Sequence, residues 1–304
     1  MTDASRSAGG SNLFGISLMV LSMAAFGLGD AFVKLAASEM SPAQVAFWLT
    51  LGAVVIFAFL ALVRGEALFD RALLHPTVGA RCVVEAVGAF SMITAFATVP
   101  LSTVAAILQA SPLVLTIAAA TFLKEQVGWR RWMAIMVGFC GVLLIVQPGT
   151  GGFQPETLYA VLGMLALSFR DFFGRIVPRG IPTLVLSAAT LAAVLPAALI
   201  WALSVDGALL PLDPPWLIMA GMVAFGTAGY FLVTLSVRVA ELSAVAPFRY
   251  SRLLFAGVLG MVIFGERPDA VMYAGAALIL GSGLYSMWRE RLRAQDLHSS
   301  ARAG

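Results

Sequence analysis

The sequence predicts an all-α membrane protein of ten transmembrane helices, arranged as two inverted repeats of five helices each. Three observations predict this fold: 60% of the 304 residues are hydrophobic, only 12% are charged, and the second half of the chain repeats the first. An ordinary soluble domain is about half apolar and about a quarter charged. A spanning helix needs about 20 apolar residues, so ten spans leave no room for a separate soluble domain.

Apolar runs between turn residues and charge clusters give the spans in chain order. In the first repeat, residues 13–147, they lie at 13–37, 44–63, 78–98, 102–123 and 132–146. A linker rich in Gly and Pro follows at 148–157 and is expected on the periplasmic side. In the second repeat, residues 158–288, the spans lie at 158–177, 182–203, 216–237, 243–264 and 270–288. Residues 1–12 and 289–304 are predicted to be cytoplasmic tails.

The internal repeat has a fixed offset of 141 positions, the separation of Asp30 from Asp171. Each unit has five spans, an odd number, so the second copy must enter the membrane from the opposite side. Inverted repeats of this kind are found in many secondary transporters. The same offset aligns Lys34 with Arg175, Gly88 with Gly229, Leu101 and Ser102 with Leu242 and Ser243, and Glu125 with Glu266.

Basic residues predict the orientation, because cytoplasmic loops carry an excess of Lys and Arg. With a cytoplasmic N-terminus, the outer loops hold only Arg267. Both termini are therefore expected in the cytoplasm, with the chain in the inner membrane. The ten basic residues of the inner loops and tails are then Arg64, Arg71, Lys124, Arg130, Arg131, Arg179, Arg238, Arg289, Arg291 and Arg293.

Two long segments carry a family resemblance. Residues 101–146, which begin LSTVAAILQASP, and residues 242–285, which begin LSAVAPFRYSRL, are rich in small residues and contain the equivalent Glu125 and Glu266. They resemble the paired repeats of the drug/metabolite transporter superfamily, and more narrowly its ten-helix EamA-type members. The resemblance covers nearly the whole chain and implies both the fold and a transport function.

Shorter motifs are similar to the S-adenosylmethionine and carboxylate/amine uptake branch of that family. They are GDAFVKLA around Asp30, AFWLT after Pro42, Arg81, and APFRYSRLL around Arg249. The chain departs from the branch in the second span, where Leu49 or Thr50 replaces an Arg. A second departure is Arg252, which stands where the branch has an acidic residue; this would alter recognition of a cationic substrate.

Charged residues inside the spans are candidates for the functional site. A charge at the bilayer centre costs about 3 kcal/mol on insertion scales, so such residues usually face a cavity or a partner. Three pairs with a spacing of four could neutralise each other within one helix, or their members could serve function. They are Asp30 with Lys34, Arg81 with Glu85, and Asp171 with Arg175, which leaves Arg170, Arg249 and Arg252 in surplus.

The surplus arginines need an anionic counterpart. This could be a helix carbonyl end, a regrouped Glu85 or Asp171, or a substrate carboxylate or phosphate, which arginine binds bidentately. In the predicted orientation, several of these charges share the inner half of the bilayer and could form one polar cluster with Arg249. The predicted substrate-binding residues are Arg249, Tyr250, Arg252, Arg170, Asp171, Arg81, Glu85 and Gln109.

Further roles are predicted for a few of these residues and for two prolines. Tyr250 and Gln109 occupy equivalent positions of the two repeats and could offer hydrogen bonds or simply pack. Pro112 and Pro247 remove a backbone donor within a span and could act as kinks or hinges. Asp171, Glu85 and Asp30 are candidate proton carriers, because a low dielectric favours the protonated form of a carboxyl group.

The sequence predicts a secondary transporter of a small organic metabolite: an amino acid or derivative, an S-adenosylmethionine-like compound or a carboxylate. Open alternatives are an exporter of drugs or toxic metabolites, a riboflavin- or nucleotide-type vitamin carrier, a channel, and an intramembrane enzyme. The sequence has no HExxH, GxSxG, P-loop or dinucleotide motif, and its histidines are His75 and His298. No cofactor, catalytic residue or metal site is therefore expected. The expected partners are a substrate and the bilayer, not nucleic acid, in a monomer or homodimer.

Overall fold

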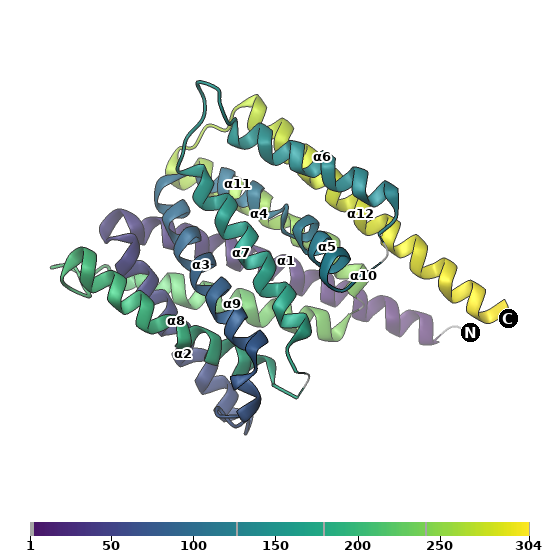
Figure 1. Ribbon diagram of the computed structural model, residues 1–304, viewed down its shortest axis with the longest axis horizontal. Helices are drawn as coiled ribbons and strands as arrows, with labels where there is room; N and C mark the ends of the chain where they lie inside the picture. The colour runs from purple at the N-terminus through teal and green to yellow at the C-terminus, as the bar shows by residue number, and fades with distance from the viewer. Residues whose placement is uncertain (1–2, 126, 179, 241, 304) are drawn as a thin grey trace.

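The computed structural model describes residues 3–125, 127–178, 180–240 and 242–303, with side chains for 12–125, 127–178, 180–236, 239–240 and 244–289. Every element in this part of the chain is helical (Figure 1). In chain order the elements are α1 (Asp3–Glu39), α2 (Pro42–Val63), η1 (Arg71–Leu74), α3 (Pro76–Thr98), α4 (Leu101–Leu108), α5 (Ser111–Phe122), α6 (Trp129–Val146), α7 (Thr157–Ile176), α8 (Thr183–Asp206), α9 (Trp216–Val239), α10 (Leu242–Val245), η2 (Ala246–Tyr250), α11 (Ser251–Phe264) and α12 (Ala270–Ala303).

Ten segments of the described chain are long and apolar enough to cross a membrane. α4 and α5 together form the fourth span, and η2 and α11 together form the ninth. The predicted all-α class with ten spans is confirmed, and each predicted boundary lies within three residues of the observed one.

Local capping explains why the second span begins earlier than predicted. The Ser41 hydroxyl accepts a hydrogen bond from the Gln44 amide at 3.2 Å, and the Gln44 side chain accepts one from the Ser41 amide at 3.3 Å. This capping box satisfies two donors that a helix start leaves open. Pro42 occupies the first helical position, where no N–H is needed. α2 therefore starts at Pro42, and the Ser41 hydroxyl also donates to Asp206 at the end of α8.

The contacts between helices follow the repeat. α1 packs along α9. The repeat counterpart of α1 is α7 and that of α9 is α3, and these two helices likewise pack along each other. α2 packs on its own counterpart α8, and α6 on its counterpart α12. Figure 1 shows α6 and α12 running side by side at one edge of the bundle. This pattern is the one expected when a pseudo-two-fold axis in the membrane plane relates two inverted repeats.

Glycine allows the close approach of α6 and α12. A Cβ atom on Gly141 would lie 2.6 Å from the carbonyl oxygen of Gly275, and one on Gly275 would lie 2.7 Å from the carbonyl oxygen of Gly141. Either contact is too short for a real side chain, so these backbones can touch only because both residues are glycine.

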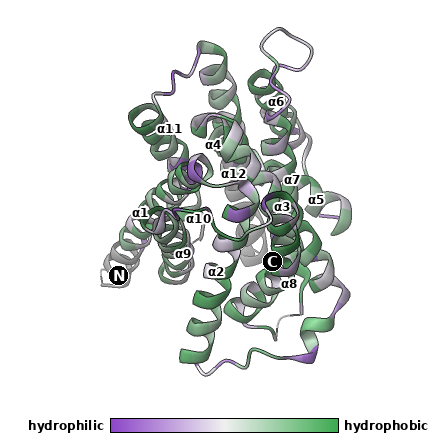
Figure 2. Cartoon of the chain, turned by 90° about the vertical axis from the view of Figure 1, so that its left-hand side faces the viewer, coloured by the Kyte–Doolittle hydropathy of each residue, from purple (hydrophilic) through white to green (hydrophobic). Residues whose placement is uncertain are grey.

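The outer surface of the bundle suits lipid rather than water. Figure 2 shows hydrophobic residues along most of the helices, with hydrophilic residues mainly in the connections. Large apolar side chains are strongly exposed, for example Phe59 at 63%, Leu143 at 57% and Val262 at 76%. Exposed apolar patches of this extent are rare on soluble proteins, so the described chain is a multi-pass membrane protein.

The described chain begins and ends on one side of the bundle. α1 begins and α12 ends at the same end (Figure 1), as an even number of spans requires. Arg179, a predicted inner-loop residue, lies outside the described residues, as do the side chains of Arg238, Arg291 and Arg293. Which side of the membrane this end faces stays a prediction.

Candidate functional site

The fourth and ninth spans are each interrupted near their centre. Between α4 and α5 the Gln109 amide donates to the carbonyl of Ala106, three residues back, at 3.2 Å. Pro112 has no N–H and cannot donate to the carbonyl of Leu108, so the α-helical ladder is broken here. In the ninth span the tighter 3₁₀ helix η2, which contains Pro247, stands before α11. Both prolines therefore lie where a span departs from α-helical geometry, and a hinge role for them stays a prediction.

Two equivalent polar side chains lie at these interruptions. Gln109 and Tyr250 are both buried, each with 9% of its surface exposed. Within the part of the chain that the structure describes, neither Gln109 Nε2 nor the Tyr250 hydroxyl has a hydrogen-bond partner. The Tyr250 hydroxyl lies against Gly283 of α12, where any Cβ atom would overlap it. Buried polar atoms are nearly always paired in proteins, so two orphans at equivalent positions need an explanation beyond packing.

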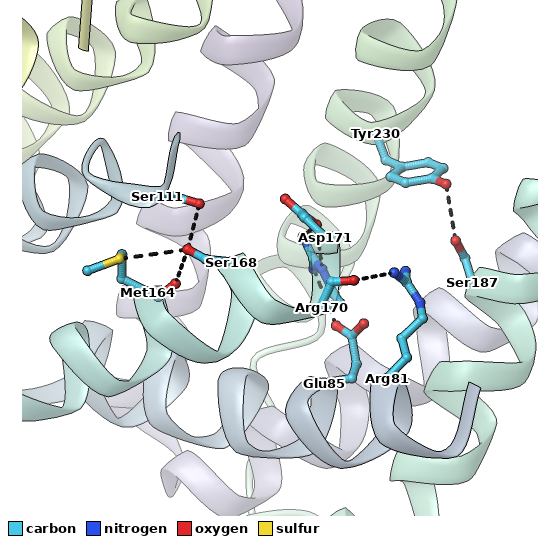
Figure 3. A network of polar contacts seen from close by, with 9 residues as sticks. All are labelled: Arg81, Glu85, Ser111, Met164, Ser168, Arg170, Asp171, Ser187 and Tyr230. Atoms are coloured by element: carbon cyan, nitrogen blue, oxygen red, sulfur yellow. Dashed lines mark hydrogen bonds and ion pairs between the residues drawn. The ribbon is translucent and has the colours of Figure 1, made fainter. Parts of the chain in front are cut away.

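Four of the predicted site residues meet between α3 and α7 (Figure 3). Arg170 binds Glu85 through Nη1 and Oε1 at 3.3 Å, and Asp171 through Nη2 and Oδ1 at 2.9 Å. Arg81 donates from Nη1 to the carbonyl oxygen of Arg170 at 2.8 Å. The two arginines balance the two carboxylates in formal charge. We call these four residues the α3–α7 charge cluster.

This arrangement corrects two of the predicted pairs within helices. Glu85 pairs with Arg170 and not with Arg81. Asp171 also pairs with Arg170 and not with Arg175. The reason is that α3 and α7 pack along each other, so Arg170 reaches a carboxylate on the neighbouring helix as well as its own neighbour Asp171. Arg170 is therefore not a surplus charge, and Arg175 is exposed beyond the cluster.

A second ion pair joins α1 to α11. Arg252 binds Asp30 in a forked geometry, with Nη2 at 2.9 Å from Oδ1 and 2.7 Å from Oδ2, and Nε at 3.1 Å from Oδ2. The guanidinium also lies over the ring of Phe26, 5.1 Å from its centroid. The predicted pair of Asp30 with Lys34 is therefore wrong, and the prediction that Arg252 lacks a neighbouring acid is wrong too. Fork-shaped arginine–carboxylate pairs of this kind are the strong ones.

Lys34 pairs with the second repeat instead. Its ammonium lies 3.7 Å from Glu266 Oε1 and donates to the carbonyl oxygen of Val99 at 2.6 Å. Glu266 also accepts hydrogen bonds at the start of α4: 2.5 Å from the Leu101 amide, 3.0 Å from the Ser102 amide and 2.7 Å from the Ser102 hydroxyl. A carboxylate at a helix start is favourable because the first N–H groups have no intrahelical partner. We call this arrangement the Glu266 cap.

Arg249 does not join the other charges. It lies on η2 with an exposed side chain, and among the described residues it forms no ion pair. Arg252, three residues further along the chain, is only partly exposed and binds Asp30 instead. The single inner cluster predicted from the sequence is therefore divided into the α3–α7 charge cluster, the Asp30–Arg252 pair and a separate Arg249.

Some polar contacts near these residues had no signal in the sequence. Ser168 of α7 donates to Ser111 at the start of α5 at 2.8 Å, and Tyr230 of α9 shares a hydrogen bond with Ser187 of α8 at 3.1 Å (Figure 3). Serine is common in membrane helices, so none of these positions stood out. For the Glu266 cap, by contrast, the repeat offset that relates Glu266 to Glu125 was a usable signal.

The α3–α7 charge cluster gives a first testable prediction. Replacing Arg170 by methionine leaves Glu85 and Asp171 without their cation and should lower the free energy of unfolding by about 1–2 kcal/mol, moderated by partial exposure. Arg81→Met removes a bond to a neutral carbonyl and should cost less. Thermal unfolding of the purified variants in detergent measures both. Equal losses for the two variants would contradict the pairing.

The fold and its buried charges define a class: a membrane protein of ten spans in two inverted repeats, with broken helices and paired charges at membrane depth. A family model described as the EamA-like transporter family matches residues 13–147 and 154–288. The chain belongs to this family, within the drug/metabolite transporter superfamily, and is a transporter of small metabolites.

Characterised relatives differ in what they carry. The S-adenosylmethionine uptake transporter of Rickettsia prowazekii is 25% identical over 298 residues, which cover 95% of this chain and 97% of the relative. The riboflavin transporter of Rhizobium johnstonii is 32% identical over 219 residues, 70% of each chain. The pseudopaline exporter of Pseudomonas aeruginosa is 26% identical over 274 residues, 88% of this chain and 93% of the exporter.

A solved crystal structure supports the fold. It superposes with a TM-score of 0.61 at 18% sequence identity, covering 93% of this chain and 99% of the other. At this identity the likeness extends to the fold alone.

Proposed function

We propose that this chain is a secondary transporter of the bacterial inner membrane that moves a small organic metabolite by alternating access, with both termini in the cytoplasm. The proposed substrates are amino acids and their derivatives, S-adenosylmethionine-like compounds and carboxylates. The absence of a P-loop motif from the sequence leaves an ion gradient or the substrate gradient as the energy source.

The observation that carries the proposal is the matched pair of helix interruptions at Gln109 and Tyr250. Secondary transporters with inverted repeats bind substrate near the midplane, at discontinuous helices of both repeats. Here each interruption holds a buried polar atom that lacks a partner among the described residues. Such an atom costs stability unless it serves a ligand. We assign Gln109 and Tyr250 to substrate binding.

The charged residues of the ion pairs are less available to a substrate than Gln109 and Tyr250. Because Arg170 and Arg252 already bind carboxylates, a substrate would have to displace those partners to reach them. Among the ion pairs of the described residues, the Asp171 side chain is the most exposed member, at 42%, against 10% for Glu85 and 11% for Asp30. We therefore rank Asp171 first among the three candidate proton carriers.

A ligand panel with purified protein tests the proposal. S-adenosylmethionine, amino acids, carboxylates, riboflavin and nucleotide sugars are compared by thermal stabilisation, where a ligand at 100 times its Kd contributes about 2.7 kcal/mol. We expect one class to stabilise the protein. Riboflavin is the second candidate because a riboflavin transporter is the relative with 32% identity.

Tyr250→Phe sharpens the test. Because it deletes a buried hydroxyl that has no partner among the described residues, the unliganded protein should unfold at the same temperature or higher. The ligand-induced shift should nevertheless fall, as it should in Gln109→Leu. Tyr285→Phe is the matched control, since Tyr285 is an exposed tyrosine of α12. A ligand shift that survives both site substitutions would remove Gln109 and Tyr250 from the site.

A further inference from the structure

A polar cavity of about 130 Å³ lies at the end of the bundle where α5 ends and α6 begins, and α7 and α12 contribute to its wall. This volume is well above the roughly 10–15 Å³ that a single water needs. Its polar lining comes from four helices and one loop: Thr116, Glu125, Arg131, Arg175 and Ser286. In the proposed orientation it opens toward the cytoplasm.

A buried hydroxyl oxygen on the cavity wall, Ser286 Oγ, lacks a hydrogen-bond partner among the described residues. Ser286 is only 6% exposed. Gly283, one turn earlier on α12, also lines the cavity and lies against the Tyr250 hydroxyl. Two buried hydroxyls without a described partner therefore lie beside the same stretch of α12. The cavity and the helix interruption at Tyr250 therefore share Gly283 as a neighbour.

Charges of both signs line the same cavity. Arg175 makes no ion pair among the described residues, because its predicted partner Asp171 binds Arg170. Arg131 donates to the Thr116 hydroxyl at 3.1 Å, which fixes the orientation of its guanidinium. The carboxylate of Glu125 is exposed on the same wall. A guanidinium suits a carboxylate, and a carboxylate suits an ammonium.

The fold does not require this polarity, because the repeat counterpart of the cavity wall is mostly apolar. In the second repeat the equivalent acidic residue is Glu266. Its carboxylate already binds Lys34 and the start of α4 in the Glu266 cap. The counterparts of Thr116, Arg131 and Ser286 are Gly257, Met272 and Ile145.

One position explains why Glu125 stays in the cavity. A Cβ atom on Gly260 would lie 2.4 Å from Glu266 Oε2, so glycine is needed where the Glu266 carboxylate folds back over its own helix. The equivalent residue in the first repeat is Ala119, whose side chain occupies that space. Glu125 cannot fold back in the same way without displacing Ala119, which keeps its carboxylate available to a ligand.

We propose that this cavity binds the α-amino-acid headgroup of the substrate. Arg175 and the Ser286 hydroxyl hold the carboxylate, and Glu125 holds the ammonium. The inference rests on the proposed function and narrows its substrate class to compounds with both groups. It also gives the chain a cytoplasmic substrate contact that has no counterpart in the second repeat.

Binding to the purified full-length protein tests the inference. The probes are S-adenosylmethionine and L-methionine, with methionine methyl ester, which lacks the carboxylate, and N-acetylmethionine, which lacks the ammonium. We expect the first two to bind and the two blocked compounds to bind at least about tenfold more weakly, as for a lost charged hydrogen bond. Arg175→Gln and Glu125→Gln should each weaken binding about tenfold, and Ser286→Ala several-fold.

Controls separate binding from folding. Ser286→Ala removes a buried hydroxyl without a described partner, so its unliganded unfolding temperature should not fall. Arg130→Gln is the matched charge control, because Arg130 stacks over Trp129 at 5.5 Å and does not line this cavity; its affinity should be unchanged.

Failure of the inference can be told from failure of the proposed function. If another compound of the panel binds while both amino-acid probes do not, the inference is overturned and the transporter proposal stands. Unchanged affinity in Arg175→Gln and Glu125→Gln overturns it as well. If no compound of the panel binds or is transported, both proposals fall together.

Discussion

Replacing Glu266 by alanine should lower the free energy of unfolding by about 3 kcal/mol. The substitution leaves the Leu101 and Ser102 amides without their acceptor and Lys34 without its anion, and hydrogen bonds to a charged group are worth about 1.5–3 kcal/mol each. The Glu266 side chain is only 8% exposed, so water can replace these bonds only in part. Thermal unfolding in detergent measures the loss.

The repeat supplies a matched control for this prediction. Glu125 occupies the equivalent position but is exposed, so Glu125→Ala should change stability by no more than about 0.5 kcal/mol. Equal losses for the two variants would mean that the asymmetry between the repeats has no energetic consequence. A Lys34→Met variant should reproduce part of the Glu266→Ala loss.

Breaking the Asp30–Arg252 pair should have the largest effect of the substitutions considered. Removing one partner of a buried ion pair costs about 3–5 kcal/mol, because the other charge is left uncompensated. Asp30→Leu and Arg252→Met should therefore each destabilise the protein strongly. The double variant Asp30→Leu with Arg252→Met should recover much of the loss, since no unpaired charge remains. A double-mutant cycle of unfolding free energies measures this coupling.

Arg249 is the matched control for that cycle. It lies three residues before Arg252 on an exposed part of η2, so Arg249→Ala should stay within about 0.5 kcal/mol of the parent protein. A large loss in Arg249→Ala together with a small one in Arg252→Met would reverse the assignment of the buried cation.

The spans and their repeat could be predicted because they depend on local composition and on a regular offset. A run of about 20 apolar residues has few options other than a spanning helix, and the offset between Asp30 and Asp171 relates whole elements. The same offset also indicated Glu125 and Glu266 as equivalent ends. The exact ends of the spans could not be predicted in this way. For example, the capping box at Ser41 starts α2 at Pro42.

The ion pairs could not be predicted because they depend on which helices meet. The spacing of four between Asp30 and Lys34 is favourable in an isolated helix, but only by about 0.2–0.5 kcal/mol. In the folded chain, α11 offers Arg252 to Asp30 across 222 positions of sequence, with a forked geometry that outweighs this local preference. The exposed side chain of Arg249 likewise depends on how η2 lies in the bundle, which the spacing of residues along the chain does not specify.

The central claim is that the chain is a carrier which alternates access to a site at Gln109 and Tyr250. Counterflow in proteoliposomes tests this claim most directly. Vesicles preloaded with the unlabelled compound selected by the ligand panel are diluted into a trace of the same compound carrying a label. A carrier predicts transient accumulation of label above its equilibrium level, saturable and strongly reduced in Tyr250→Phe and Gln109→Leu but not in Tyr285→Phe. Simple equilibration that rises linearly with concentration, equal in all variants, would contradict it.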